Sequence, residues 1–227
     1  RGAARDGQWA IVRDAYTSLG ARYPGDPGND AGALDFAESL LRTGAAPEAR
    51  PRLEKFVEGH AGDARAPRAL VLVAQAYEAG GERDKALELY ARVRRDYPSA
   101  EGLDRAAVSQ ARLLQSEGKW DAARPLFQKG LDAEDPGSAG EASYRLGEGY
   151  RAAGQHAEAV QAYMTAAYLA PDSPWGRKAL LGAGQSLAAL RQNDSAVIVY
   201  RKLVAAKDAE PELVESARAG LKSLGIN

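Results

Sequence analysis

The chain has 227 residues, of which 45% are hydrophobic and 27% are charged, a composition that can both form a core and solvate a surface. Its formal net charge is −1, so no overall field attracts nucleic acid or anionic lipid. No apolar run approaches the roughly 18 residues that a membrane-spanning helix needs, and we expect no direct membrane insertion.

The first predicted element, residues 7–24, is repeated later in the chain. The ARYP sequence at 21–24 resembles the RDYP sequence at 95–98, and the same offset brings Tyr16 onto Tyr90. Residues 7–24 match only the second half of the repeat that this offset defines. We therefore expect a single helix there and a repeat array that continues upstream of Arg1.

Three columns of similar residues stay in register along the chain, in steps of 36 or 37 residues. Chance does not hold three columns in register over this length, so the columns predict a repeat protein. The small-residue column is Ala37, Ala74, Ala111, Gly147 and Gly184. The second column is Val12, Ala49, Ala86, Ala123, Ala159 and Ala196, and the large-residue column is Tyr16, Leu53, Tyr90, Phe127, Tyr163 and Tyr200.

Each repeat is predicted to contain two helices. Leu70, Val73, Ala74 and Tyr77 fall at i, i+3, i+4 and i+7, which places them on one helix face, and a second such stripe follows a Gly-Gly pair. Glycine permits the tight turn between the helices. Glycine marks the same break at residues 44, 118 and 154, whereas residues 191–193 lack it and are expected to build the turn from Gln and Asn.

Two prolines and the C-terminal segment modify this pattern. Pro51 and Pro125 occupy the same repeat position near the start of a second helix, where they cannot donate a backbone hydrogen bond, so those helices are expected to start late or bend. Residues 212–224 form one further amphipathic stripe, which we interpret as a capping helix. The predicted parts are a second helix plus linker (1–29), five repeats (30–66, 67–103, 104–139, 140–176 and 177–208) and the cap (209–227).

Two of these units resemble the tetratricopeptide repeat (TPR). Their signature positions are Leu70, Val73, Ala74, Tyr77, Gly81, Ala86, Tyr90 and Pro98 in one unit, and Leu146, Gly147, Tyr150, Gly154, Ala159, Tyr163, Ala166 and Pro171 in the other. The resemblance covers nearly the whole chain. It implies an all-α fold, a right-handed solenoid of about twelve helices in antiparallel pairs without strands.

The family resemblance also implies a function and a location. TPR proteins bind a protein or peptide partner on the concave face that their first helices form. The period of 36 to 37 residues exceeds the usual 34, which is similar to TPR proteins of bacterial envelope assemblies, such as Tol-Pal accessory and outer-membrane assembly lipoproteins. We therefore expect a bacterial periplasmic or cell-envelope protein. The absence of cysteine fits this compartment and fits a cytoplasmic location equally well.

The resemblance assigns ligand-contacting positions to the first helix of each pair. At these positions Arg, Glu and Gln surround apolar residues, a mixture that suits an extended peptide or a partner helix. We call these residues the concave strip. Its predicted binding residues are Glu38, Arg42, Gln75, Glu78, Arg105, Arg112, Gln115, Tyr144, Glu148, Arg151 and Gln185, with Leu34, Arg68, Val71, Val108, Glu141, Lys178, Leu181 and Ala188 at the remaining positions.

The residues that could suggest a catalytic, metal-binding or phosphate-binding site are better explained as parts of turns and helices. With no cysteine and only His60 and His156, we expect no catalytic residues, no metal site and no cofactor, and hence no enzyme. Residues 26–30 resemble a calcium loop, but their glycine is displaced and no glutamate stands at the twelfth position, so we expect a turn with Asp30 as a helix cap. The Gly-x-Gly of residues 182–186 follows no strand, which argues against phosphate binding.

The three tryptophans each stand near a predicted helix start. Trp9 and Trp120 share one repeat position and are predicted to be packing residues. Trp175 follows Ser173 and Pro174, a favourable cap and first-turn pair, and is expected to be a partly exposed contact point in the linker.

Three functions remain open at the level of the sequence. The first is an interaction scaffold in a multiprotein assembly of the cell envelope. The second is the regulatory or targeting arm of a larger enzyme. The third is self-association into a homo-oligomer through the concave face or the C-terminal helix.

Overall fold

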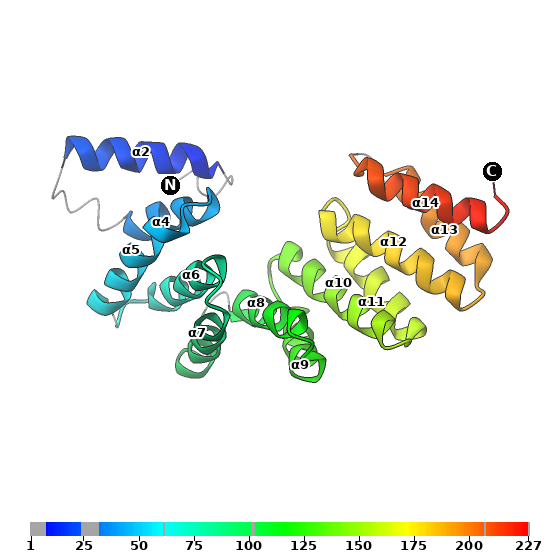
Figure 1. Cartoon of the computed structure of the whole chain (residues 1–227), viewed down its shortest axis with the longest axis horizontal. Coiled ribbons are helices and arrows are strands. Elements are labelled where there is room, and N and C mark those ends of the chain that lie inside the picture. The colour runs from blue at the N-terminus through cyan, green and yellow to red at the C-terminus, as the bar shows by residue number, and fades with distance from the viewer. Residues whose placement is uncertain (1–7, 24–31, 61, 101–102, 207, 227) are drawn as a thin grey trace. The chain divides into compact units, whose positions relative to one another are not determined.

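The computed structural model describes residues 8–23, 32–60, 62–100, 103–206 and 208–226. Over these residues the chain forms twelve helices and no strand, which confirms the predicted all-α fold of helix pairs. The chain divides into two compact units, residues 1–106 and 107–227. Within each unit, successive helices run antiparallel to one another (Figure 1).

The helices follow the predicted repeats closely. Helix α2 stands alone, the later helices follow in pairs within the predicted repeats, and α14 lies in the segment that was predicted to be a cap. In the first unit they are α2 (Trp9–Arg22), α4 (Ala33–Arg42), α5 (Ala46–Gly59), α6 (Ala66–Ala79) and α7 (Arg83–Asp96). Helix α8 (Leu103–Ser116) begins in the first unit and continues into the second, followed by α9 (Trp120–Gly130), α10 (Pro136–Ala152), α11 (His156–Leu169), α12 (Pro174–Ala189), α13 (Asn193–Val204) and α14 (Pro211–Ser223).

The prolines do not delay their helices, so the prediction of a late start is wrong. Helices α5 and α9 begin at Ala46 and Trp120, the same repeat position as the starts of α7, α11 and α13, and both continue through Pro51 or Pro125. Both prolines are exposed. The carbonyl that loses its hydrogen-bond donor therefore lies on the solvent side, where water can replace the missing N–H.

The turn after α12 also differs from its prediction. The glycines at 44, 81, 118 and 154 have φ between 74° and 86°, a left-handed conformation that glycine adopts without steric cost. At the equivalent position, Arg191 has φ 59°. The turn is thus built on an arginine in the left-handed region rather than on Gln192 and Asn193, because the tight connection demands a positive φ at this one position.

In the second unit, two tyrosines of the large-residue column pack against glycines. Tyr163 of α11 is fully buried. A Cβ added to Gly147 of α10 would lie 2.5 Å from the ring of Tyr163, and one added to Gly182 of α12 would also lie 2.5 Å from it. The ring thus lies between the two first helices of successive repeats, both of which need glycine there. Tyr200 packs in the same way, since a Cβ added to Gly184 would lie 2.4 Å from its ring and one added to Gly220 would lie 2.6 Å from it.

In the first unit, aliphatic side chains occupy the equivalent positions. Leu53 stands in the large-residue column and is fully buried, and Ala37 and Leu72 stand where Gly147 and Gly182 face Tyr163. All three belong to one buried cluster that α4, α5 and α6 form. Helices α4, α5 and α6 therefore combine a smaller central side chain with a larger neighbour, whereas Tyr90 keeps a large ring in the same column of the first unit.

Three further sequence features concern the Gly-x-Gly segment, residues 26–30 and membrane-spanning helices. The Gly-x-Gly segment lies inside α12, where Gly182, Gly184 and Ser186 are buried among packed helices. Residues 26–30 lie outside the described residues. No helix among the described residues combines the length and the apolar character that crossing a bilayer would require.

Candidate functional site

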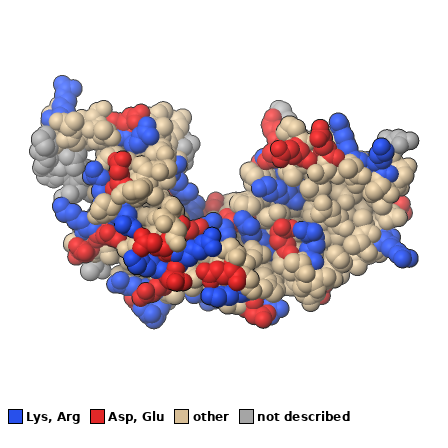
Figure 2. Space-filling model, viewed as in Figure 1, with Lys and Arg blue, Asp and Glu red and all other residues tan. Residues whose placement is uncertain are grey.

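The first unit contains a groove of about 1420 Å³ on the side formed by α4 and α6. We call it the α4–α6 groove. Side chains of these two helices line it together with Trp9 of α2, the linker residues 62–65 and 96–100, and Arg105. Four of the predicted binding residues line this one groove, namely Glu38, Arg42, Gln75 and Arg105. Acidic and basic side chains alternate closely over the face of this unit in Figure 2.

The apolar part of the groove is formed by Val71 and Leu72 of α6 and by the half-buried ring of Trp9. The guanidinium carbon of Arg42 lies 5.8 Å from the centre of the Trp9 ring. Such cation–π contacts hold a cation over an aromatic face. Trp9 and Arg42 therefore form one wall that offers both an apolar surface and a positive charge.

An ion-pair network joins the two helices of the groove. Arg68 Nη2 lies 2.6 Å from Glu38 Oε2 and 2.9 Å from Asp35 Oδ1. The Arg42 guanidinium lies 3.4 Å from Glu38 Oε1. The Glu38 side chain is only 8% exposed, whereas that of Arg68 is 47% exposed. Glu38 thus fixes two arginines at the groove, and it is the arginines that face solvent.

The linker between α5 and α6 is held by a second ion pair, between Asp63 and Arg65. The carboxylate of Asp63 accepts hydrogen bonds from the backbone N–H of Arg65 (2.8 Å) and from its guanidinium (2.6 Å from Oδ2 to Nη2). These hydrogen bonds hold the pKa of Asp63 well below its usual range. Arg65 also lies over the ring of Phe56, at 5.0 Å. The linker therefore presents a defined edge to the groove.

Other strip residues serve the internal packing of their repeats. The hydroxyl of Tyr163 donates a hydrogen bond to Glu148, and Arg151 Nε lies 3.3 Å from the same hydroxyl. Burial, together with the bond to Glu148, raises the pKa of Tyr163 far above its usual value. In the first unit Tyr90 donates to Glu78 at 3.2 Å. These three charged residues thus orient the ends of buried tyrosines.

The remaining strip residues do not gather at one point. Gln115 donates a hydrogen bond from Nε2 to the backbone oxygen of Arg145 (3.3 Å). Arg112 is half-buried and Gln185 is exposed. Tyr144 packs against Trp175, with 5.6 Å between the ring centres. The role of these residues in partner binding stays a prediction.

The sequence did not reveal Trp9 as a groove residue. Its equivalent, Trp120, is the packing residue that was predicted: a Cβ added to Gly149 would lie 2.1 Å from the Trp120 ring. In the repeat that follows Trp9, the position of Gly149 is taken by Ser39, which is fully buried. The two tryptophans are therefore followed by different residues at this position of the next repeat.

Trp175 lies in α12 rather than in a linker. Ser173 caps this helix, since its hydroxyl accepts a hydrogen bond from Gly176 N at 3.1 Å, as the sequence predicted. The two histidines are half-buried, and the ring of His60 stacks on Phe56 at 4.2 Å. Across the described residues, no three His, Asp or Glu side chains are arranged to hold a metal ion.

Comparison with known proteins identifies the repeats. Residues 68–100 and residues 108–174 each match a model of the tetratricopeptide repeat. No curated protein sequence matches the chain.

Solved structures share the fold. The MamA RS-1 ArsTM double mutant superposes with a TM-score of 0.62 and 19% identity, over 84% of this chain and 97% of that chain. A MamA fragment (41-end) from Desulfovibrio magneticus RS-1 gives 0.60 and 19%, over 77% and 93%. The TPR-like repeats of a putative kinesin light chain from Podosopora anserina give 0.58 and 21%, over 88% and 98%. The chain therefore contains tetratricopeptide repeats and folds as TPR proteins do.

Proposed function

We propose that this chain, whose helix pairs are tetratricopeptide repeats, is a non-catalytic scaffold that holds an extended segment of a partner protein in the α4–α6 groove. The observation that carries the proposal is the convergence of Arg42, Gln75 and Arg105 around the apolar surface of Val71 and Trp9. An apolar floor with a polar rim is the arrangement that peptide-binding surfaces use.

The groove is well prepared to bind such a segment. Glu38 and Asp35 hold Arg68, and Glu38 also holds Arg42, so these side chains are ordered before a partner arrives. Binding then costs less conformational entropy than it would with free arginine side chains. Trp9 and Val71 can cover an apolar side chain of the partner, while Gln75 can hydrogen-bond to its backbone.

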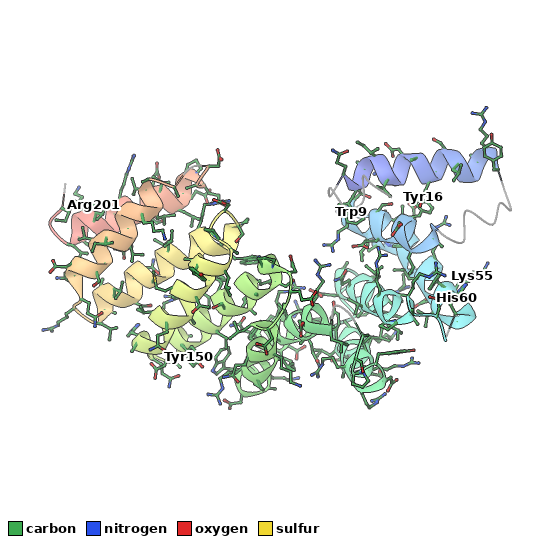
Figure 3. The ribbon with its side chains drawn as sticks, turned by 180° about the vertical axis from the view of Figure 1, so that it is seen from behind. Trp9, Tyr16, Lys55, His60, Tyr150 and Arg201 are labelled. Carbon is green, nitrogen blue, oxygen red and sulfur yellow. The ribbon has the colours of Figure 1, made fainter. Side chains whose placement is uncertain are left out.

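Site-specific photo-crosslinking tests this proposal. A benzophenone amino acid replaces Gln75 in the groove of the full chain, and a matched variant carries it at Lys55 on α5. Lys55 is exposed and lies on the side of the first unit away from Trp9 in Figure 3. The cells should yield one discrete crosslinked partner from the Gln75 variant and none from the Lys55 variant.

Two outcomes would contradict the proposal. Equal crosslinking from both positions would show that the groove has no special role. A product of twice the mass of the chain would identify a second copy as the occupant in place of another protein.

We also propose that the protein works in the envelope of a bacterium. The long repeat period supports this location, and the absence of cysteine is compatible with it. Fractionation of cells that produce the full-length protein would test it, since the proposal requires the protein in the periplasmic or membrane fraction, and recovery in the cytosol alone would refute it.

A further inference from the structure

In the second unit, the second helices of two successive repeats, α11 and α13, expose large apolar side chains. Tyr168 of α11 is 83% exposed, Met164 of the same helix is 37% exposed, and Ile198 of α13 is 68% exposed. Met164 and Tyr168 are four residues apart and therefore share one helix face. Ile198 stands one repeat after Gln161, which is also exposed, so α11 and α13 present these positions on the same side of the unit. Single exposed apolar side chains are common, but three on one side mark a surface that contacts another molecule.

Helix α11 lacks the charges that α7, the second helix of an earlier repeat, carries at the same repeat positions. The exposed positions of α7 include Lys85, Glu88, Arg92 and Arg95. The equivalent positions of α11 hold Glu158, Gln161, Thr165 and Tyr168. Water solvates the charged face of α7 well. On α11 the same face exposes an aromatic ring and uncharged side chains, and covering it would therefore be favourable.

The charges that remain on this side lie at opposite ends of the two helices. Glu158 stands in the first turn of α11, and Arg201 and Lys202 stand in the last turn of α13. In the part of the chain that the structure describes, none of the three has an ion-pair partner. The apolar and charged residues together define what we call the α11–α13 face. It consists of Glu158, Met164, Tyr168, Ile198, Arg201 and Lys202.

The distribution of charge favours one occupant of this face. Asp194 is exposed in the first turn of α13, so the side that carries the face has two charges of each sign. A surface with balanced charges does not attract an anionic membrane or a nucleic acid. It instead matches a surface with the same charges in the reverse order along the helices. The same face turned by 180° has that order.

A two-fold axis perpendicular to both helices therefore makes the face complementary to itself. Helices α11 and α13 run in the same direction, because successive helices alternate in direction (Figure 1). The axis places α11 of one copy antiparallel on α13 of the second copy. The first turn of α11, with Glu158, then meets the last turn of α13 with its two cations, and Tyr168 meets Ile198.

The spacing along the helices agrees with this pairing. The rise from Glu158 to Met164 along α11 is about 9 Å. The rise from Lys202 to Ile198 along α13 is about 6 Å. The long side chains of lysine and arginine span the difference, so the ion pairs and the apolar contact can form together.

We propose that the α11–α13 face is the interface of a homodimer with two-fold symmetry. Such an interface uses the same surface on both copies, so association stops at two chains. The inference goes beyond the proposed scaffold function, and no residue of the face lines the α4–α6 groove. Only two helices of each copy take part, which places the interface at the small end of specific interfaces. We therefore expect a dissociation constant on the order of micromolar.

Sedimentation velocity of the full chain over a range of concentrations tests the proposal. The sedimentation coefficient of the wild type should rise with concentration and level off at the value of a dimer. Ile198→Glu and Tyr168→Ala should raise the dissociation constant about tenfold or more, because they alter the apolar centre of the interface. The matched controls are Ile11→Ala on α2, a side chain that is 57% exposed, and Glu88→Lys on α7. Both should leave the dissociation constant within about twofold.

A charge exchange tests the two-fold arrangement itself. Glu158→Lys places like charges on both sides of the ion pairs, and so does the double variant Arg201→Glu with Lys202→Glu. Each should dimerise about tenfold or more weakly than the wild type. An equimolar mixture of the two variants should recover the affinity of the wild type, because both contacts of the mixed dimer then join opposite charges. Thermal unfolding of every variant checks that the fold is intact.

Several results would overturn the proposal. They are a wild type that stays monomeric at the highest concentration, a dimer that Ile198→Glu leaves unchanged, and a mixture of the charge variants that associates no better than each alone. Growth beyond two chains would show a head-to-tail contact in place of the two-fold one. Cosedimentation with vesicles of anionic lipid that Tyr168→Ala abolishes would assign the face to a membrane instead.

Discussion

In the second unit the ring of Tyr163 lies between Gly147 and Gly182, whereas in the first unit the equivalent positions hold Leu53, Ala37 and Leu72. The register of the repeat is the same in both units. What differs is how the space between successive helix pairs is filled. A large central ring requires neighbours without side chains, while a smaller leucine leaves room for a second leucine.

The units also differ in how polar side chains join their helices. In the first unit Arg68 connects α6 to two carboxylates of α4, next to the groove. In the second unit a comparable pair, Arg177 with Glu210, lies at the C-terminal end and fixes the start of α14. The stability of the first unit should therefore fall when a cation such as Arg68 is removed. The stability of the second unit should fall when a side chain is added at a glycine.

The largest effect should come from Gly182→Leu. A Cβ alone would lie 2.5 Å from the fully buried ring of Tyr163, so overpacking should lower the free energy of unfolding by about 3 kcal/mol or more. Urea unfolding followed by circular dichroism measures this loss. The control Gly137→Ala, whose Cβ would lie 3.5 Å from the Asp135 side chain, should change stability by less than about 1 kcal/mol.

The double variant Tyr163→Leu with Gly182→Leu sharpens this comparison, because it copies the arrangement of the first unit. The loss in the free energy of unfolding caused by Gly182→Leu should be at least about 2 kcal/mol smaller in the Tyr163→Leu background than in the wild type. Additive losses would mean that the two residues do not share one space.

Arg68→Ala should have the next largest effect. It leaves the carboxylate of Glu38, whose side chain is 8% exposed, with only Arg42 at 3.4 Å. Since a buried charge loses a hydrogen-bond donor, the free energy of unfolding should fall by about 2 kcal/mol. Lys55→Ala on the exposed face of α5 should change it by less than about 0.5 kcal/mol. If chemical denaturation gave the same loss of stability for Arg68→Ala and Lys55→Ala, the result would contradict a stabilising role of the ion-pair network around Glu38.

Arg191→Gly should make the second unit more stable. The arginine has φ 59° where the other turns have glycine, and glycine removes a steric cost of about 1 kcal/mol in this region. The midpoint of thermal unfolding should rise. Arg201→Gly, inside α13, is the matched control and should lower it by a similar amount. A lower midpoint for Arg191→Gly would show that the arginine side chain has a role of its own.

The smallest effect concerns the Arg177–Glu210 pair and is dependent on pH. Hydrogen bonds from Arg177 lower the pKa of Glu210 below its ordinary value of 4.5. The pair therefore stabilises the fold above about pH 4.5, and this contribution is lost as the pH falls through the lower folded-state pKa.

Because the Glu210 side chain is 40% exposed, Glu210→Gln should cost less than about 1 kcal/mol at pH 7. The difference from the wild type in denaturant unfolding should become smaller as the pH is lowered below 4.5. Glu215→Gln, an exposed carboxylate of the same helix, should show no difference over this pH range. A Glu210→Gln difference that stays constant from pH 7 to pH 3 would contradict the ion pair.

The sequence predicted the helix pairs because packing columns such as those of Tyr163 and Ala159 recur at a fixed period, and it predicted the last helix from the apolar stripe of residues 212–224. It did not predict that α5 would continue through Pro51, since exposure of the proline decides that outcome. Nor did it show that Trp9 lines a groove while Trp120 packs against Gly149 of the next repeat, because such contacts join residues of different repeats.

For the candidate site, repeat position placed Glu38, Arg42, Gln75 and Arg105 among the predicted binding residues. These four line the α4–α6 groove, but repeat position did not predict their contacts. Glu38 and Gln75 occupy equivalent positions in successive repeats. Glu38 is nevertheless held by two arginines, one of them from the next repeat, while Gln75 lines the groove. Ion pairs between repeats depend on side-chain geometry, which a family pattern does not contain.

The most direct test of the central claim is the affinity of the partner that crosslinks at Gln75, measured by calorimetric titration. The α4–α6 groove predicts that Val71→Glu in the full chain weakens binding at least tenfold, because a charge enters the apolar floor, while Lys55→Glu leaves the affinity within twofold. An unchanged affinity for Val71→Glu, or an equal loss in both variants, would contradict the groove as the binding site.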